Sequence, residues 1–199
     1  MTHGKKPSVA ANEQDLQALE RELRSEKRRR NYGKALKSTI YSLLVVAAVA
    51  ILIATMVMPV LHISGSSMTP VIGDGEVAAV LRTDNLERGD IVAFYYNNKI
   101  LVKRVIAFPG ERVELDSSGN VRIDGKILDE PYITDKAMGE VSIDWPHQVG
   151  EGKLFVLGDH RSTSHDSRSA LIGDVSIEEQ VIGRVFLRVW PLNKFGFIQ

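Results

Sequence analysis

The sequence predicts a mostly β domain, a sandwich or partly closed barrel, that follows one N-terminal membrane-spanning α-helix. Three observations support this fold class. No charged residue occurs from Ile40 to Leu61, and a helix needs roughly 20 such residues to cross the hydrocarbon core of a bilayer. The chain beyond carries many short runs of β-forming residues separated by turn signals. Its length of 199 residues leaves room for one compact domain and a tail.

The charge pattern orients the apolar segment. Residues 1–37 contain ten Lys or Arg and five Asp or Glu, and the basic run Lys27–Arg30 lies just before the apolar residues. Because basic residues mark the cytoplasmic side of a membrane helix, we expect the N-terminus inside and the C-terminus outside. The apolar run exceeds the roughly 7–15 residues of a signal-peptide core, which favours an uncleaved, single-pass anchor in the cell membrane. The expected organisation is a cytoplasmic basic tail at 1–37, an anchor at 38–61 and an extracytoplasmic domain at 62–199.

Seven short runs after the anchor predict β-strands, because they are rich in β-formers and bounded by turn signals such as Pro109-Gly110. They are Glu76–Leu81, Asp90–Tyr96, Ile100–Phe108, Arg112–Leu115, Val121–Ile123, Lys153–Leu157 and Val181–Trp190. The segment Val113–Ile127 predicts a hairpin with a further turn at Asp124-Gly125. Residues 134–152 are polar and irregular, and predict a mobile loop.

The composition argues against several classes of function. The net charge is zero at pH 7, so no strongly basic surface indicates nucleic acid. The chain has no cysteine, which excludes disulfides and thiolate chemistry. It also has no His-Glu-x-x-His motif, and we expect neither a metal nor another cofactor.

The stretch Ile63–Pro70 follows directly on the anchor and is rich in small and hydroxyl residues. Gly65 can take backbone angles closed to other residues, and Pro70 fixes a turn. Such a loop is compatible with a plain linker. It can also present the hydroxyl of Ser66 or Ser67 as a nucleophile if a base lies nearby.

Lys103 lies within the predicted strand Leu101–Ile106, between apolar residues on one face. An edge lysine can extend its ammonium group to water. A lysine that is buried instead loses its proton more easily, since desolvation lowers the pKa of an amine. A dry environment would therefore allow Lys103 to act as a general base.

The polar stretch Gly158–Arg168 follows an apolar strand. A solvated surface turn would have a similar composition. Asp166 and Arg168 are close enough in sequence to form a charge-assisted pair. The hydroxyl of Ser164 could donate a hydrogen bond to a neutral amine and orient it.

Together these three stretches resemble the signature sequences of type I signal peptidases, the membrane-bound serine proteases that remove signal peptides. The matching segments are Ser64–Pro70, Lys103-Arg104-Val105 with Pro109-Gly110, and Gly158-Asp159 through Asp166-Ser167-Arg168. The short spacing between them is similar to that of Gram-positive-type enzymes. The resemblance implies a mostly β catalytic domain behind the anchor, which cleaves signal peptides from exported preproteins.

The resemblance also implies a role for each matching residue. Ser67 corresponds to the nucleophile and Lys103 to the general base of a Ser/Lys dyad. Ser164 corresponds to the serine that positions the lysine, and Asp166 and Arg168 to an ion pair that supports the site.

The loop around the nucleophile departs from part of the family pattern. Gly65 and Ser66 precede the nucleophile, and Gly65 stands where some members carry a second hydroxyl for the oxyanion hole. Here that hole would rest on backbone N–H groups, mainly that of Ser67. Met68 would line shallow pockets for the small side chains that the family requires at substrate positions −1 and −3, and would contact lipid. His160 stands where an asparagine is common.

Three other functions fit parts of the sequence. A Ser-His-Asp hydrolase would use His160 or His165 with Asp166. A self-cleaving regulator of the SOS-repressor type would share the Ser/Lys chemistry. A non-catalytic, membrane-anchored β-domain that binds extended peptides would need neither Ser67 nor Lys103.

Overall fold

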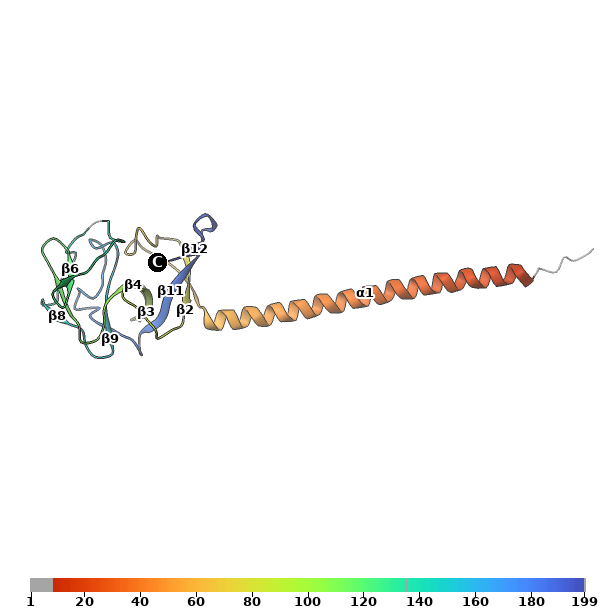
Figure 1. The fold of residues 1–199 in the computed structure, drawn as a ribbon, viewed down its shortest axis with the longest axis horizontal. Helices are drawn as coiled ribbons and strands as arrows, with labels where there is room; N and C mark the ends of the chain where they lie inside the picture. The colour runs from red at the N-terminus through yellow and green to blue at the C-terminus, as the bar shows by residue number, and fades with distance from the viewer. Residues whose placement is uncertain (1–8, 135, 199) are drawn as a thin grey trace, which may run out of the picture. The chain divides into compact units, whose positions relative to one another are not determined.

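The computed structural model describes residues 9–134 and 136–198. The chain divides into two units, Met1–Ala54 and Thr55–Gln199, and each is described by itself. Figure 1 shows a long helix in the first part of the chain and a β domain in the rest.

Helix α1 runs without interruption over the 49 residues from Val9 to Val57. Its segment Asn31–Met56 is long and apolar enough to cross a membrane. The helix ends just before Pro59, because proline lacks a backbone N–H and disfavours helical geometry at the residue before it. Val60 and Leu61 of the predicted anchor accordingly lie in a strand.

The mostly β fold class is confirmed, since the second unit contains two antiparallel sheets. The eight-stranded sheet has the order β1-β2-β11-β3-β4-β9-β10, with β12 paired to β11. Its strands are β1 Val60–His62, β2 Val77–Leu81, β3 Ile91–Tyr96, β4 Lys99–Ala107, β9 Lys153–Leu157, β10 Val175–Ser176, β11 Val181–Trp190 and β12 Gly196–Phe197. A short 3-10 helix, η1 Leu192–Lys194, connects the last two strands.

The four-stranded sheet has the order β7-β6-β5-β8. Its strands are β5 Arg112–Leu115, β6 Val121–Ile123, β7 Lys126–Ile127 and β8 His147–Gln148. The predicted hairpin is confirmed by the antiparallel pairing of β5 with β6 and of β6 with β7. Asp124 and Gly125 form the second turn with φ angles of 49° and 78°, in the left-handed region that this turn type requires.

Strand β4 lies inside the larger sheet, between β3 and β9, and contributes side chains to two buried hydrophobic clusters. Its side chains alternate between the two faces of the sheet. Val105 packs in a buried cluster with Val92 and Leu154, whereas Ile106 packs with Phe155 and residues of the smaller sheet. A fixed β4 therefore places Lys103 and Arg104 on opposite faces of a rigid sheet.

Candidate active site

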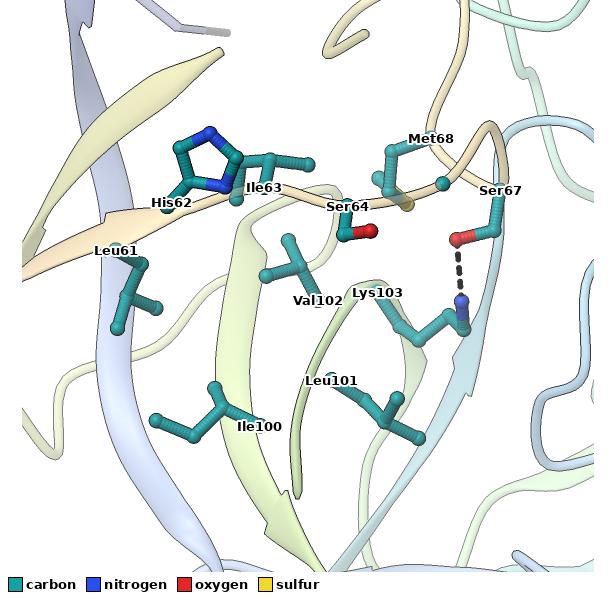
Figure 2. Close-up of a pocket in the computed structure, with 11 residues that line it drawn as sticks. Leu61, His62, Ile63, Ser64, Ser67, Met68, Ile100, Leu101, Val102 and Lys103 are labelled. Atoms are coloured by element: carbon teal, nitrogen blue, oxygen red, sulfur yellow. Dashed lines mark hydrogen bonds between the residues drawn. The ribbon is translucent and has the colours of Figure 1, made fainter. Parts of the chain in front are cut away.

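The structure brings together two residues that lie 36 positions apart in the chain. The Nζ atom of Lys103 is 2.7 Å from the Oγ atom of Ser67, as the dashed line in Figure 2 shows. Lys103 comes from the middle of β4, and Ser67 from the loop between β1 and β2. The pairing that the sequence predicted is therefore formed.

The loop that carries Ser67 is fixed at both ends. The N–H of Ile63 donates to the carbonyl of Glu76 at 2.8 Å, which closes the loop. Gly65 has a φ of 99°, which favours glycine, and its N–H donates to Asp74 Oδ1 at 2.7 Å. Met68 is buried in the core cluster that also contains Ile63. These contacts fix the backbone on both sides of Ser67, at Gly65 before it and at Met68 after it.

Lys103 is buried, with only 3% of its surface exposed. Burial lowers the pKa of its amine from 10.5 to about 8, because desolvation penalises the ammonium form. Asp166 and Asp159 favour the charged amine and Arg168 opposes it, so these three charges partly cancel. Near neutral pH the neutral amine is therefore far more abundant than in an exposed lysine.

A pocket of about 150 Å³ lies beside the Ser67–Lys103 contact. It is lined by Leu61, His62, Ile63, Ser64, Gly65, Ser67, Met68, Ile100, Leu101, Val102 and Lys103. β1 is an edge strand of its sheet, and β4 pairs with β9 only from Arg104 onward. The pocket therefore lies between two strand segments whose backbone groups are open to pairing. In Figure 2, Leu61 and His62 point to opposite sides of β1.

The loop after β9 contributes the other predicted residues. Two hydrogen bonds of 2.8 Å join the guanidinium of Arg168 to the carboxylate of Asp166, and both side chains are fully buried. Ser164 is buried against Gly158. Its Oγ makes no hydrogen bond within the described residues, so the contact between Ser164 and Lys103 stays a prediction.

Two further buried ion pairs lie near the site. Each contains one residue, Arg104 or Glu130, for which the sequence alone indicated no partner. Arg104 forms two hydrogen bonds to Asp159, of 2.8 and 2.7 Å. Arg161 pairs with Glu130, and the ring of Tyr132 lies 3.9 Å from the Arg104 guanidinium carbon. The separation of 31 residues between Glu130 and Arg161 has no local signal in the sequence.

Neither histidine of this loop contacts the hydroxyl of Ser67 in the described part of the chain. His160 Nδ1 is 2.8 Å from Thr163 Oγ1, and His165 pairs with Glu140 at 3.1 Å on the surface. No group of three His, Asp or Glu residues forms a metal site among residues 9–134 and 136–198. The hydroxyl of Ser67 thus pairs with the amine of Lys103 and with neither imidazole of this loop. Such an arrangement is suited to nucleophilic acyl transfer.

Comparisons with known proteins show the family to which the chain belongs. The family model described as "Signal peptidase, peptidase S26" matches residues 36–190. The chain therefore belongs to the signal peptidase family and is a peptidase.

Individual relatives include signal peptidase IB of Staphylococcus aureus strain MRSA252. It is 34% identical over 184 residues, which cover 82% of this chain and 94% of that protein. A probable signal peptidase I-2 of Synechocystis sp. is 34% identical over 161 residues, 75% of this chain and 71% of that protein. A crystal structure of a signal peptidase I from Enterococcus faecalis V583 is 31% identical, with a TM-score of 0.43, and covers 51% of this chain and 97% of that one.

Proposed function

We propose that this chain is a membrane-bound serine endopeptidase that removes N-terminal signal peptides from exported preproteins with a Ser67/Lys103 dyad. The observation that carries the proposal is the 2.7 Å contact between the hydroxyl and a buried amine. A general base must lie within hydrogen-bond reach of the proton it removes and must be unprotonated near the working pH. The pKa of Lys103, lowered to about 8, supports the second requirement, because it makes the neutral amine far more abundant near neutral pH than in an exposed lysine.

The reaction follows from this geometry. Neutral Lys103 accepts the hydroxyl proton while Ser67 Oγ attacks the scissile carbonyl carbon, and the N–H of Ser67 stabilises the oxyanion. The carbon–nitrogen bond then breaks, and the Lys103 ammonium returns the proton to the leaving amine. Water attacks the resulting ester with Lys103 again as base, which releases the signal peptide and restores both residues.

The other predicted residues support the dyad. Ser164, whose buried hydroxyl has no partner among the described residues, donates a hydrogen bond to the neutral amine of Lys103 during turnover. The buried pair of Asp166 and Arg168 fixes the loop on which Ser164 lies. Gly65 and Ser66 shape the turn before the nucleophile.

The substrate binds as an extended chain between β1 and β4, since open strand edges pair with the backbone of a peptide. The pocket of about 150 Å³ has room for only small side chains, which agrees with small residues at substrate positions −1 and −3. Met68 forms part of its wall. Apolar residues near the pocket also contact membrane lipid.

The N-terminal helix anchors the enzyme as a single-pass membrane protein. The segment Asn31–Met56 supports spanning by its length and composition. The basic residues before it favour a cytoplasmic tail at 1–37, with the anchor at 38–61 and the catalytic domain at 62–199 on the outer side.

The test compares cleavage of a labelled preprotein by the full chain in detergent micelles. We expect Ser67→Ala and Lys103→Ala each to lower kcat by about a thousandfold or more, with folding intact by circular dichroism. The matched control is Ser118→Ala, an exposed serine in a turn of the smaller sheet. The wild-type kcat/KM should rise with pH through about 8, as the Lys103 amine loses its proton.

Three outcomes would contradict the proposal. Cleavage retained by Ser67→Ala but lost in Ser66→Ala would move the nucleophile to Ser66. An active Lys103→Ala variant together with an inactive His160→Ala variant would favour a histidine base. A well-folded wild-type protein that binds the preprotein without cleaving it would indicate the peptide-binding module.

A further inference from the structure

The segment Glu130–Tyr132 lies outside the strands, after β7, and contributes two side chains to the surroundings of the active site. The carboxylate of Glu130 is buried and pairs with the guanidinium of Arg161. Oε1 accepts one hydrogen bond from Nη2, and Oε2 lies 3.4 Å from Nη1. Since an isolated buried charge is very costly, this pairing keeps Arg161 inside the domain.

Arg161 in turn holds the backbone of the loop after β9. Only 1% of Arg161 is exposed, and its Nε donates a hydrogen bond to the carbonyl of Gly158 at 3.1 Å. The carbonyl of Arg161 accepts a 2.9 Å hydrogen bond from Arg168. One guanidinium therefore links Glu130 to the backbone of the loop that carries the predicted lysine-orienting serine.

That loop touches the nucleophile directly. A Cβ atom at Gly158 would lie 2.6 Å from the carbonyl oxygen of Ser67 and 2.1 Å from Ser164 Oγ, so the backbone passes between these two residues without free space. The N–H of His160 donates to the same Ser67 carbonyl at 3.0 Å. Any displacement of residues 158–160 therefore displaces Ser67, Ser164 or both.

Tyr132 makes a second connection from the same segment. Its hydroxyl donates to Glu130 Oε1 at 3.1 Å, and its ring lies against Arg104, the residue after Lys103. Burial raises the pKa of Tyr132, so its hydroxyl keeps its proton and stays a donor. Glu130 thus lies where contacts to the loop of Ser164 and to strand β4 converge.

We propose that Glu130 is a positioning residue of the active site, which acts through Arg161 to hold the Gly158–His160 backbone against Ser67. This inference rests on the proposed Ser/Lys function. Loss of the Glu130 carboxylate leaves the buried Arg161 without its acidic partner, and its guanidinium turns towards water. The loop then loosens, the Ser67–Lys103 contact lengthens and water reaches the amine.

The prediction concerns the pH profile as well as the rate. The charges that act on Lys103 are Asp166, Arg168 and Asp159, and all three remain in a Glu130→Gln variant. Hydration of the amine returns the pKa of Lys103 towards 10.5. The limb of the kcat/KM profile that rises near pH 8 in the wild type therefore moves to higher pH.

The experiment measures cleavage of a peptide that spans a signal-peptide cleavage site, by the full chain in detergent micelles, between pH 6 and 10. For Glu130→Gln we expect kcat at pH 7 to fall about tenfold, KM to stay within about twofold, and the rising limb to move up by about half a pH unit. The matched control is Glu114→Gln, which removes a partly exposed carboxylate that lies 3.5 Å from Arg112. Its profile should coincide with that of the wild type.

A second variant provides the same test if Glu130→Gln does not fold. Tyr132→Phe removes only the hydroxyl that bonds Glu130 and keeps the ring against Arg104, and it should move the profile in the same direction by a smaller amount. Folded variants whose kcat and pH profile match the wild type would overturn the proposal. A loss of activity that follows the folded fraction, with an unmoved profile, would also overturn it.

The two proposals fail in different ways. If Ser67→Ala still cleaves the peptide, the proposed function of the Ser67/Lys103 dyad is itself wrong. If the wild type cleaves and Ser67→Ala does not, the pH profiles of Glu130→Gln and Tyr132→Phe decide the positioning role alone.

Discussion

Two regions of the molecule surround Lys103 and differ in chemistry. The first is the pocket, which includes the apolar side chains of Leu61, Ile63, Met68, Ile100, Leu101 and Val102 in its lining. The second is the arginine–carboxylate cluster, in which three buried arginines each have an acidic partner. These pairs are Arg104 with Asp159, Arg161 with Glu130, and Arg168 with Asp166.

The difference indicates that the reactivity of Lys103 and its position have different physical causes. Desolvation is the largest influence on the pKa of Lys103 and lowers it, whereas the effects of Asp166 and Arg168 oppose each other. Paired charges add little net field but hold the chain in a fixed arrangement through directional hydrogen bonds. Burial of Lys103 thus makes the amine reactive, and the cluster determines where the amine and the hydroxyl lie.

The largest effect should come from breaking a pair in the cluster. Arg168→Met leaves the Asp166 carboxylate fully buried without its partner, and removal of one member of a buried ion pair costs about 3–5 kcal/mol. We expect the free energy of unfolding of the β domain to fall by that amount, measured by urea denaturation of the full chain in detergent. An unchanged midpoint and an unchanged cleavage rate would show that the cluster is dispensable for both stability and geometry.

Removal of the amine should have the opposite effect on stability. The pKa of Lys103 is about 8 in the folded chain, against 10.5 for a lysine in water, so between these values the unfolded chain binds more protons and stability rises with pH. Below pH 8 the folded protein carries the full penalty of the buried ammonium. Lys103→Met should therefore stabilise the domain by about 3 kcal/mol at pH 7, since each pKa unit corresponds to about 1.4 kcal/mol.

The pH dependence of that gain is the measurement that checks it. Thermal unfolding of wild type and Lys103→Met should differ most below pH 8 and converge above about pH 10.5. A gain that stays constant over this range would mean that packing of the methionine, and not the buried charge, accounts for the stabilisation.

Local features of the sequence predicted most of the fold. The charge-free segment gave the apolar helix, and all seven runs of β-formers became strands within a few residues of the predicted bounds. Among the strands that were not predicted, β8, β10 and β12 have only two residues each, and β1 has three. Two residues cannot display an alternating pattern, and only pairing with a neighbouring strand defines them.

The candidate site was predictable where one side chain and its neighbours in sequence determine the chemistry. Lys103 stood between apolar residues, which fitted either an edge lysine that reaches water or a lysine in a dry environment, and the resemblance to signal peptidases favoured the second. Glu130 had no such signal, because its partner Arg161 comes from a distant loop that only the folded sheets bring near. Long-range pairs of this kind depend on tertiary structure, so a single sequence does not define them.

A smaller effect is expected from the apolar region. Ile100 lines the pocket and is 41% exposed, so Ile100→Ser should leave stability nearly unchanged while it removes hydrocarbon that contacts the substrate. We expect KM to rise about fivefold, or about 1 kcal/mol, with kcat unchanged. Ile127→Ser is the matched control, because Ile127 is 58% exposed and lies in the other sheet. A fall in kcat with constant KM would mean that Ile100 helps to position Ser67 and Lys103. The pocket and the ion-pair cluster would then not have separate roles.

The smallest effect should come from the side chain of His160. The loop holds Ser67 through the backbone N–H of His160. Among the described residues, the imidazole forms hydrogen bonds with the nearby hydroxyls of Ser162 and Thr163. His160→Asn keeps the N–H and a polar side chain, so kcat/KM should change by less than about threefold and stability by less than about 0.5 kcal/mol. Steady-state cleavage and thermal unfolding of the full chain test both values. A loss of activity as large as that of Lys103→Ala, with the fold intact, would place an imidazole in the reaction, and the apolar pocket would then no longer explain the reactivity of the site.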